Sequence, residues 1–201
     1  MRIAIIGSGI SGMGAAYLLN KRHDITLFES NDKLGGHTAT VDVSVDGKEY
    51  AIDTGFIVYN EATYPLFIRL LEELGVQTQP TSMGFSVRCY KTGLEYAGNN
   101  LNTLFAQRKN LLSPYFIRLV KDILRFNKEA KEDLASGTLP ANATLGDYLE
   151  ANNYSDGFIN HYLVPMGAAI WSASTKTMMA FPLLFFVRFF KNHGLLETKE
   201  R

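Results

Sequence analysis

Residues 7–12 of the chain are Gly7-Ser8-Gly9-Ile10-Ser11-Gly12, and they directly follow the β-branched run at 2–6. That run predicts a short buried parallel strand, and residues 13–22 predict the helix that comes after the glycines. A strand, a glycine turn and a helix in this order form the context in which G-x-G-x-x-G binds a dinucleotide. We therefore expect residues 2–22 to open a βαβ nucleotide-binding unit.

Each glycine of this turn has a mechanical role. Gly7 permits the tight turn, Gly9 lets the backbone approach a pyrophosphate, and Gly12 lets helix and strand pack closely. A helix beginning near Ser11 would direct its unpaired N–H groups and its positive dipole end at the phosphates. Since no basic residue lies between Gly7 and Gly14, we expect main-chain groups to hold the diphosphate.

Glu29 ends the second predicted strand, at 25–28, and stands where an acid should meet a ribose hydroxyl. A carboxylate favours a free 2′-hydroxyl and repels a 2′-phosphate, so the adenosine of FAD and that of NAD both remain open while NADP is disfavoured. A glycine turn that merely packs is the alternative interpretation. The second glycine pair, Gly35-Gly36, weighs against it.

Residues 29–41, E-S-N-D-K-L-G-G-H-T-A-T-V, resemble the extended fingerprint of FAD-dependent oxidoreductases of the amine oxidase and phytoene desaturase type. In that group the paired glycines continue along the FAD, and an Asp-x-Gly segment comes close to the flavin. Here Asp53-Thr54-Gly55-Phe56-Ile57 matches that segment. His37 departs from the group, since most members have arginine there, and this puts any charge contact made by that arginine in doubt.

The chain resembles still more closely a bacterial branch of predicted NAD/FAD-binding, amine-oxidase-like proteins. This resemblance implies FAD as cofactor and an α/β fold, with a Rossmann-like FAD/NAD(P)-binding domain of the glutathione reductase type and an inserted α+β substrate or cap domain. Members are much longer, so we expect a truncated, N-terminal part that stops in the charged segment 197–201. The segments that carry the resemblance are residues 35–38, 53–60, 165–172 and 192–196.

The pattern along the chain predicts a FAD-binding domain at 1–76 and a mostly helical substrate or cap domain at 77–201. A hairpin at 38–45 and 48–52 and a helix at 64–75 complete the first domain. The second begins with strands at 84–90 and 94–97. Its expected helices occupy residues 113–134 and 144–151 and begin again near 156 and 178.

Ser113-Pro114 should cap and open the long helix of the second domain. Its charged residues between 121 and 133 are interpreted as a solvated face. The opposite face is expected to contain Leu119, Val120, Ile123, Leu124 and Leu134.

The candidate cofactor-binding residues follow from these motifs, and no catalytic residue is assigned. The four histidines are scattered and no cysteine cluster exists, so no metal site is predicted. His161 is interpreted as a hydrogen-bonded helix residue, and Trp171 and Tyr59 as core residues rather than an aromatic wall beside a flavin. The candidates are Gly7, Ser8, Gly9, Ile10, Ser11, Gly12, Glu29, Ser30, Gly35, Gly36, His37, Thr38, Gly55, Phe56 and Ile57.

The charge balance and the cysteine content restrict the classes of partner and the cellular location that we expect. Twenty basic and twenty acidic residues cancel, which disfavours nucleic acid as a partner. Cys89 is the only cysteine, so no internal disulfide is possible and a cytoplasmic location is expected. The first strand begins at residue 2, which leaves no room for a signal peptide. The apolar run at 181–190 is too short to cross a bilayer, although it could rest on one, line a substrate tunnel or be covered by further chain.

These patterns predict an FAD-dependent oxidoreductase in which an unidentified organic substrate, apolar or amine-bearing, gives a hydride to flavin N5. Two alternatives remain open. One is an NAD-dependent dehydrogenase that uses the same βαβ unit. The other is a non-catalytic dinucleotide-binding module or an inactive fragment.

Overall fold

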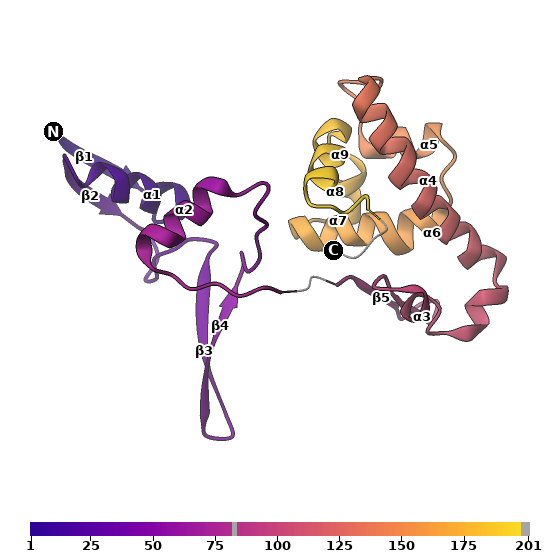
Figure 1. The fold of residues 1–201 in the computed structure, drawn as a ribbon, viewed down its shortest axis with the longest axis horizontal. Helices are drawn as coiled ribbons and strands as arrows, with labels where there is room; N and C mark the ends of the chain where they lie inside the picture. Colours follow the sequence, from indigo (N-terminus) through magenta and orange to yellow (C-terminus); the bar gives the residue numbers. More distant parts are fainter. Residues whose placement is uncertain (82–83, 198–201) are drawn as a thin grey trace. The chain divides into compact units, whose positions relative to one another are not determined.

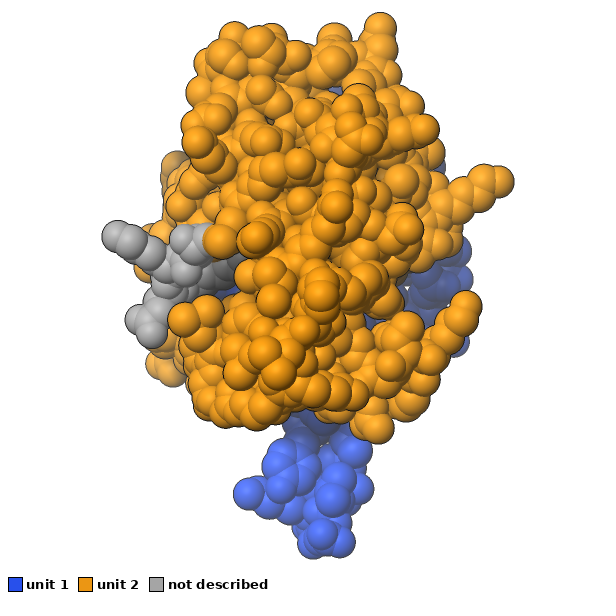
Figure 2. Space-filling model, turned by 90° about the vertical axis from the view of Figure 1, so that its right-hand side faces the viewer, with its two compact units in different colours: residues 1–59 blue, residues 60–201 orange. Residues whose placement is uncertain are grey.

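The computed structural model describes residues 1–81 and 84–197. Its contacts divide the chain into two compact units, residues 1–59 (unit 1) and 60–201 (unit 2), which are coloured separately in Figure 2. The boundary between the two units therefore lies before the predicted domain boundary at residue 76. The assignment of 1–76 and 77–201 as functional domains stays a prediction. Residues 82–83, next to the predicted strand 84–90, and most of the predicted charged end, 198–201, lie outside the described residues.

Unit 1 begins with the expected strand, helix and strand: β1 (Arg2–Ile6), α1 (Ile10–Leu19) and β2 (Asp24–Phe28) (Figure 1). The two strands pair in parallel, with Ile3 opposite Ile25. The helix lies three residues earlier at both ends than the range predicted from the sequence. It starts as soon as the glycine turn allows and gives way to a turn at Asn20, a residue that competes poorly inside helices.

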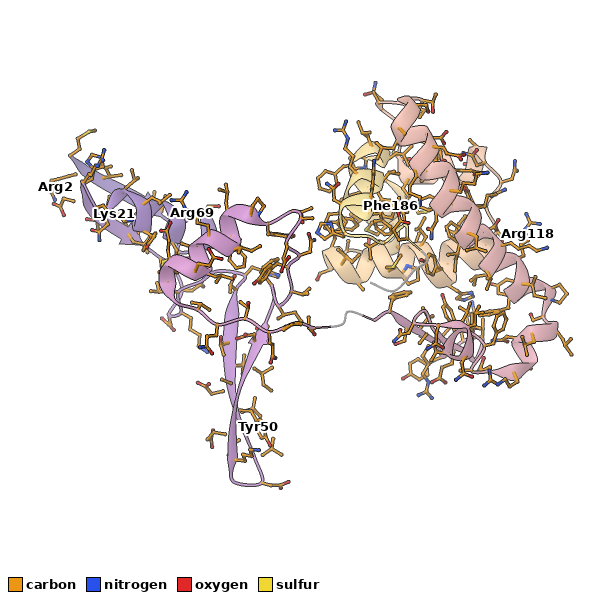
Figure 3. The ribbon with its side chains drawn as sticks, viewed as in Figure 1. Arg2, Lys21, Tyr50, Arg69, Arg118 and Phe186 are labelled. Atoms are coloured by element: carbon orange, nitrogen blue, oxygen red, sulfur yellow. The ribbon has the colours of Figure 1, made fainter. Side chains whose placement is uncertain are left out.

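The rest of unit 1 is a long antiparallel hairpin of β3 (Ala39–Val45) and β4 (Lys48–Thr54), as expected from the sequence. Both turn residues, Asp46 and Gly47, have positive φ values of 53° and 74°, which suits the right-handed twist of a two-residue hairpin. Side chains project away from both strands, Tyr50 among them, with 42% of its surface exposed (Figure 3).

Unit 2 starts with α2 (Pro65–Leu74), which ends as expected at Gly75 in the left-handed conformation. The strands β5 (Ser86–Cys89) and β6 (Leu94–Ala97) form an antiparallel pair, shorter at its start than predicted. Two short elements were not predicted: α3 (Leu101–Leu104) and the 3₁₀ turn η1 (Arg108–Leu112). Each has only about one turn, so the sequence offers too few positions to show a helical period.

The helical part of unit 2 follows its capping signals. α4 (Pro114–Ser136) is capped by the Ser113 hydroxyl, which accepts from the N–H of Phe116, and it ends at Gly137 with φ 73°. α5 (Leu145–Ala151) carries a reciprocal capping box between Thr144 and Asp147. The remaining elements are α6 (Asp156–Phe158), η2 (Ile159–Leu163), α7 (Val164–Trp171), α8 (Thr175–Met179) and α9 (Leu183–Asn192).

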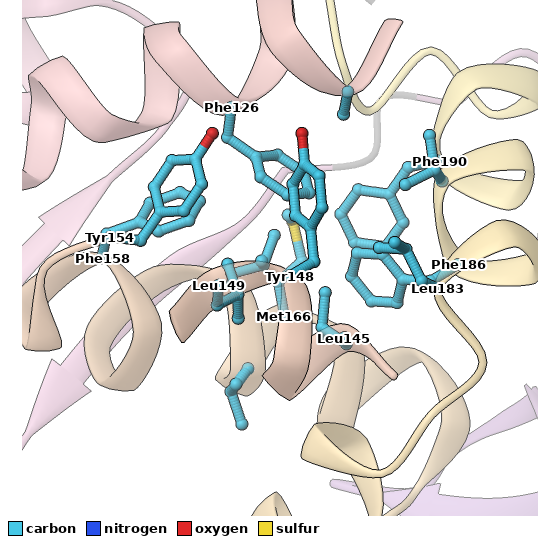
Figure 4. Close-up of a cluster of buried hydrophobic side chains, with 14 of the residues drawn as sticks. Phe126, Leu145, Tyr148, Leu149, Tyr154, Phe158, Met166, Leu183, Phe186 and Phe190 are labelled. Atoms are coloured by element: carbon cyan, nitrogen blue, oxygen red, sulfur yellow. The ribbon is translucent and has the colours of Figure 1, made fainter. Parts of the chain in front are cut away.

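The main hydrophobic core lies in unit 2, where α4, α5, α7 and α9 meet (Figure 4). Phe126 of α4 packs against Tyr154 and Phe158, with ring centroids 5.7 and 5.5 Å apart. Phe186 and Phe190 of α9 stack at 4.1 Å. All these phenylalanines are fully buried, so aromatic rings hold the helices of unit 2 together.

The expected faces of α4 were partly wrong. Leu119 is buried as predicted, but Leu124 is 54% exposed. Asp122, which was assigned to the solvated face, is buried because its carboxylate accepts from the N–H of Ser155 at 3.0 Å and so caps α6. The sequence could not show this, since the partner lies 33 residues further on.

The helix of residues 156–171 contains one π turn, η2, at the place where Pro165 would break it. Proline lacks an N–H and therefore cannot bond the carbonyl four residues earlier, which belongs to His161. The hydroxyl of Tyr96 on β6 donates to that carbonyl at 2.6 Å instead. A distant strand thus satisfies the backbone group that the proline leaves without a helical partner.

Candidate functional site

The glycine turn between β1 and α1 has the shape that its sequence predicts. Gly7 has φ 92° and donates its N–H to the Phe28 carbonyl at 2.7 Å, which joins the turn to the end of β2. A Cβ added at Gly12 would collide with the carbonyl oxygen of Gly7. Gly12 is therefore required for the close packing of helix and turn, as expected from the sequence.

The N-terminus of α1 provides unpaired main-chain donors. Gly9 caps the helix without any side-chain hydrogen bond, and the first turn contains no acidic residue. A Cβ added at Gly9 would meet no atom within 4 Å, so the space beside this residue is open. The N–H groups of Ile10, Ser11 and Gly12 lie in the first turn, where a helix has no internal acceptors. Such a terminus suits an anion.

Glu29 lies at the end of β2 and faces this turn. One carboxylate oxygen, Oε2, accepts from the Ser8 N–H at 2.8 Å and the Ser8 hydroxyl at 2.6 Å. The other, Oε1, accepts from the N–H groups of Ser30 at 2.8 Å and Asn31 at 2.9 Å. The Ser8 hydroxyl and these N–H groups hold the pKa of Glu29 down at about 2, so the acid is ionised at neutral pH.

The second glycine pair lies against the first turn. The Gly35 N–H donates to the Ser8 carbonyl at 3.1 Å, and a Cβ on Gly36 would lie 2.9 Å from the Cα of Gly9. Both glycines have positive φ values, 110° and 62°. A side chain on Gly36 would push the two turns apart, and one on Gly35 would collide with the Thr38 carbonyl oxygen of its own turn, which explains why two glycines stand here.

The third predicted segment joins the same chain of contacts. A Cβ on Gly55 would collide with the carbonyl oxygen of His37, so the Asp-x-Gly segment packs on the second glycine turn. The Thr38 N–H closes that turn on the Gly35 carbonyl at 3.1 Å. Phe56 and Ile57 follow, with 37% and 67% of their surfaces exposed.

Unit 1 therefore brings together the predicted residues of three separated segments, at 7–12, 29–38 and 55–57. These contacts show one connected surface, and whether it binds a nucleotide stays a prediction. The sequence reasoning did not find the part played by Asn31 or the link from Ser8 to Glu29. The available signal was the Ser-Asn pair after the strand, since these residues often form turns with local hydrogen bonds.

Three other side chains considered from the sequence, Trp171, His161 and Cys89, lie in unit 2. Trp171 has ring contacts with Phe181 at 4.8 Å and Phe189 at 4.6 Å, in agreement with its interpretation as a core residue. His161 bonds the Tyr115 hydroxyl through Nδ1 at 2.7 Å, and burial lowers its pKa. A hydrogen bond from Thr92 lowers the pKa of Cys89, a strand thiol as expected.

Two surface cavities, of about 420 and 280 Å³, both lie in unit 2. The larger is lined by residues of α5, α6 and α8, including Asp147 and Glu150, and the smaller by the turn around Gly93 and the start of α4. Neither includes a candidate cofactor residue. Within residues 1–81 and 84–197 no cluster of metal-ligating side chains occurs. In the same ranges no helix combines the length and apolar character that a bilayer crossing requires.

Comparison with known proteins shows which proteins the chain resembles. Residues 5–74, about a third of the chain, match the family model of the NAD(P)-binding Rossmann-like domain. The flavin-containing amine oxidase A of Sus scrofa is 34% identical over 95 residues, which is 47% of this chain and 17% of that protein. The same enzyme of Canis lupus familiaris gives the same values.

A second kind of relative matches too. The zeta-carotene desaturase of a Synechocystis strain is 35% identical over 78 residues, covering 38% of this chain and 15% of the desaturase. The aligned part of the chain thus spans less than a fifth of the length of each of these relatives. The glycine turns, the acid at the end of β2 and the names of these relatives indicate the same kind of protein. The N-terminal part of the chain is therefore similar to the NAD(P)-binding Rossmann-like domain family and to proteins of the flavin-containing amine oxidase and carotene desaturase type.

Proposed function

We propose that the chain is part of an FAD-dependent oxidoreductase and that unit 1 holds the adenosine diphosphate part of the cofactor. The observation that carries this proposal is the connected surface formed by the first glycine turn, Glu29 and the second glycine pair. Flavin-containing relatives support FAD over a diffusible nicotinamide cofactor.

The residues of unit 1 fit such a group. The open space beside Gly9 and the unpaired N–H groups at the start of α1 suit a diphosphate. The ionised carboxylate of Glu29 suits a ribose hydroxyl, which would donate to it. In this assignment Gly7 and Gly12 shape the turn and Gly35 and Gly36 let the second turn approach. The remaining candidate residues are Ser8, Ile10, Ser11, Ser30, His37, Thr38, Gly55, Phe56 and Ile57.

A bound flavin would supply the redox chemistry by accepting a hydride from the substrate at N5. The protein's part is then to bind the cofactor, orient it and exclude water. We assign no catalytic side chain. We further propose that the domain from residue 77 onward is a substrate or cap domain inserted into a fold of the glutathione reductase type. Its many apolar and aromatic side chains favour an apolar or amine-bearing small molecule, and the balanced charge of the chain disfavours nucleic acid.

The location and source of the protein belong to the same proposal. A single cysteine supports a reducing, cytoplasmic compartment. Residues 35–38 and 165–172 support a bacterial branch of the superfamily. The proposal includes peripheral contact of the aromatic run at 181–190 with a membrane surface.

The decisive experiment is to purify the full chain after expression with riboflavin and to record its absorbance after gel filtration. We expect the protein to retain flavin absorbance after gel filtration and to release FAD when it is denatured. A colourless protein that binds NADH reversibly would instead favour the NAD-dependent dehydrogenase. Bound FAD that no amine or polyene donor reduces would favour a non-catalytic dinucleotide-binding module or an inactive fragment.

Variants of two residues test the placement of the cofactor. Glu29→Ala removes a charged acceptor of ribose hydrogen bonds and should weaken FAD binding roughly ten- to a hundredfold. Gly9→Val fills the open space with a branched side chain and should weaken binding more. Isothermal titration with FAD measures both. An unchanged affinity in Gly9→Val would contradict a diphosphate at this helix end.

A further inference from the structure

We propose that Ser8 is a positioning residue that fixes one oxygen of Glu29, Oε2, so that the other oxygen, Oε1, can exchange its exposed side-chain contacts for a ribose hydroxyl of the nucleotide. This inference rests on the proposed function. It assigns different tasks to two oxygens that sequence alone cannot distinguish, and it gives a role to a serine inside the glycine turn.

Ser8 has the environment of an anchoring group. It is the only residue of unit 1, all of which is described, that is fully buried. Its N–H and hydroxyl both donate to Oε2 of Glu29, at 2.8 and 2.6 Å. The Gly35 N–H donates to the same hydroxyl at 3.2 Å and to the Ser8 carbonyl at 3.1 Å. A single buried side chain thus joins the acid to the second glycine turn.

All four contacts of Oε1 are exposed, and they differ in length. Its two main-chain donors, Ser30 and Asn31, bond at 2.8 and 2.9 Å. Its two side-chain contacts are long and exposed, 3.3 Å from the Ser30 hydroxyl and 3.2 Å from Asn31 Nδ2. Oε1 thus has four donors within 3.3 Å for about two lone-pair positions, so its two long side-chain contacts are the weaker ones. A ribose hydroxyl at Glu29 would therefore displace the two long contacts on Oε1, because the bonds on Oε2 are shorter and partly buried.

Hydrogen bonds rather than charges set the state of Glu29. Among the described residues it forms no ion pair, and each interaction that lowers its pKa is a hydrogen bond from Ser8, Ser30 or Asn31. Removing the Ser8 hydroxyl should therefore raise the pKa of Glu29 and loosen the orientation of its carboxylate. The charged and titratable groups on the surrounding elements are Arg2, Tyr17, Asp24, Asp32, Lys33, His37 and Asp53.

The test compares ADP with 2′-deoxy-ADP on the full chain by isothermal titration. The wild-type chain should prefer ADP, and Ser8→Ala should bind ADP on the order of tenfold more weakly while 2′-deoxy-ADP changes little. Asn31→Ala removes only an exposed contact that competes with the ribose, so it should keep the preference. Ser44→Ala, the same change at an exposed position of β3, is the matched control.

Carbon-13 spectra of the Glu29 carboxyl provide a readout that does not depend on nucleotide. In Ser8→Ala its pKa should rise from about 2 toward the ordinary 4.5. In the wild-type chain, ADP should shift the side-chain NH₂ signal of Asn31 and leave the Ser8 amide protected. This last measurement needs no variant and so stands even if Ser8→Ala does not fold.

Each result decides. An unchanged pKa, an unchanged preference for ADP in Ser8→Ala, or loss of Ser8 amide protection on binding would overturn the role of Ser8 while leaving the proposed function intact. A wild-type chain that binds ADP without preferring it over the 2′-deoxy form would overturn the ribose contact. Binding of neither ADP nor FAD would defeat the proposed function, and the role of Ser8 with it.

Discussion

Unit 2 is organised by a core, whereas unit 1 is organised by its turns. In the described part of unit 2, nineteen buried residues form one continuous cluster that includes Phe126 and Phe186. Of residues 1–59, all of which are described, only Ser8 is buried, and Ile6 exposes 89% of its surface. The geometry of the candidate site therefore comes from glycine conformations and hydrogen bonds, because unit 1 has no packed interior.

This difference separates conformation from stability. Glycine turns and short hydrogen bonds can fix the shape of unit 1, but the two-stranded sheet of β1 and β2, with one face exposed and the other only half-buried, gains little from apolar burial. A nucleotide bound only to the folded form would add stability in proportion to the logarithm of its concentration. We therefore expect cofactor binding to slow amide exchange in unit 1 far more than in unit 2.

The largest effect is expected from Phe126→Ala, which opens a cavity at the centre of unit 2. Loss of a fully buried phenylalanine costs about 3–5 kcal/mol in free energy of unfolding. Urea unfolding followed by the signal of Trp171 measures it. Leu124→Ala on the same helix is the control, and its exposed side chain should cost less than about 1 kcal/mol. Equal costs would show that the core of unit 2 does not dominate its stability.

A smaller effect, confined to unit 1, is expected from Gly12→Ala. The added methyl group collides with the Gly7 carbonyl and must move the backbone, at a cost of about 1–3 kcal/mol. Gly14→Ala in the same helix meets no atom within 4 Å and should be neutral or stabilising by about 0.5–1 kcal/mol. Exchange of the β1 and β2 amides reports both variants. If the two behaved alike, close packing at Gly12 would not hold the turn.

The smallest effects concern pH, and the two units should respond in different ranges. The lowered pKa of Glu29 stabilises unit 1 above about pH 4.5, and this contribution is lost as the pH falls toward 2. Burial lowers the pKa of His161, so protonation favours the unfolded form and begins to destabilise unit 2 below about pH 6.5. Amide exchange between pH 7 and 3 should show unit 2 loosening locally near His161 first. The reverse order would contradict these assignments.

The sequence predicted the turns and helix caps far better than it predicted the packing. Gly7 and Gly36 have positive φ values that few other residues adopt, so the local sequence predicts their conformations. The caps at Ser113 and Thr144 are local in the same way. Asp122 is different, because its burial depends on a partner from a distant helix, and no period along α4 can show that.

The same distinction applies within the candidate site. The role of Glu29 as an acid at a strand end could be predicted from spacing, while its saturation by Ser8 and Asn31 could not, since it depends on how two turns come together in space. The sequence analysis likewise did not predict the π turn that precedes Pro165.

That π turn couples two positions that lie 69 residues apart, Tyr96 and Pro165. A homologue that replaces the proline by a residue with an N–H can close an ordinary helical turn and no longer needs the phenol. One that keeps the proline but loses the phenol must supply another donor, a bound water molecule or a serine. Across related sequences these two positions should therefore change together, and an alignment deep enough to reveal covariation would display the link without any coordinates.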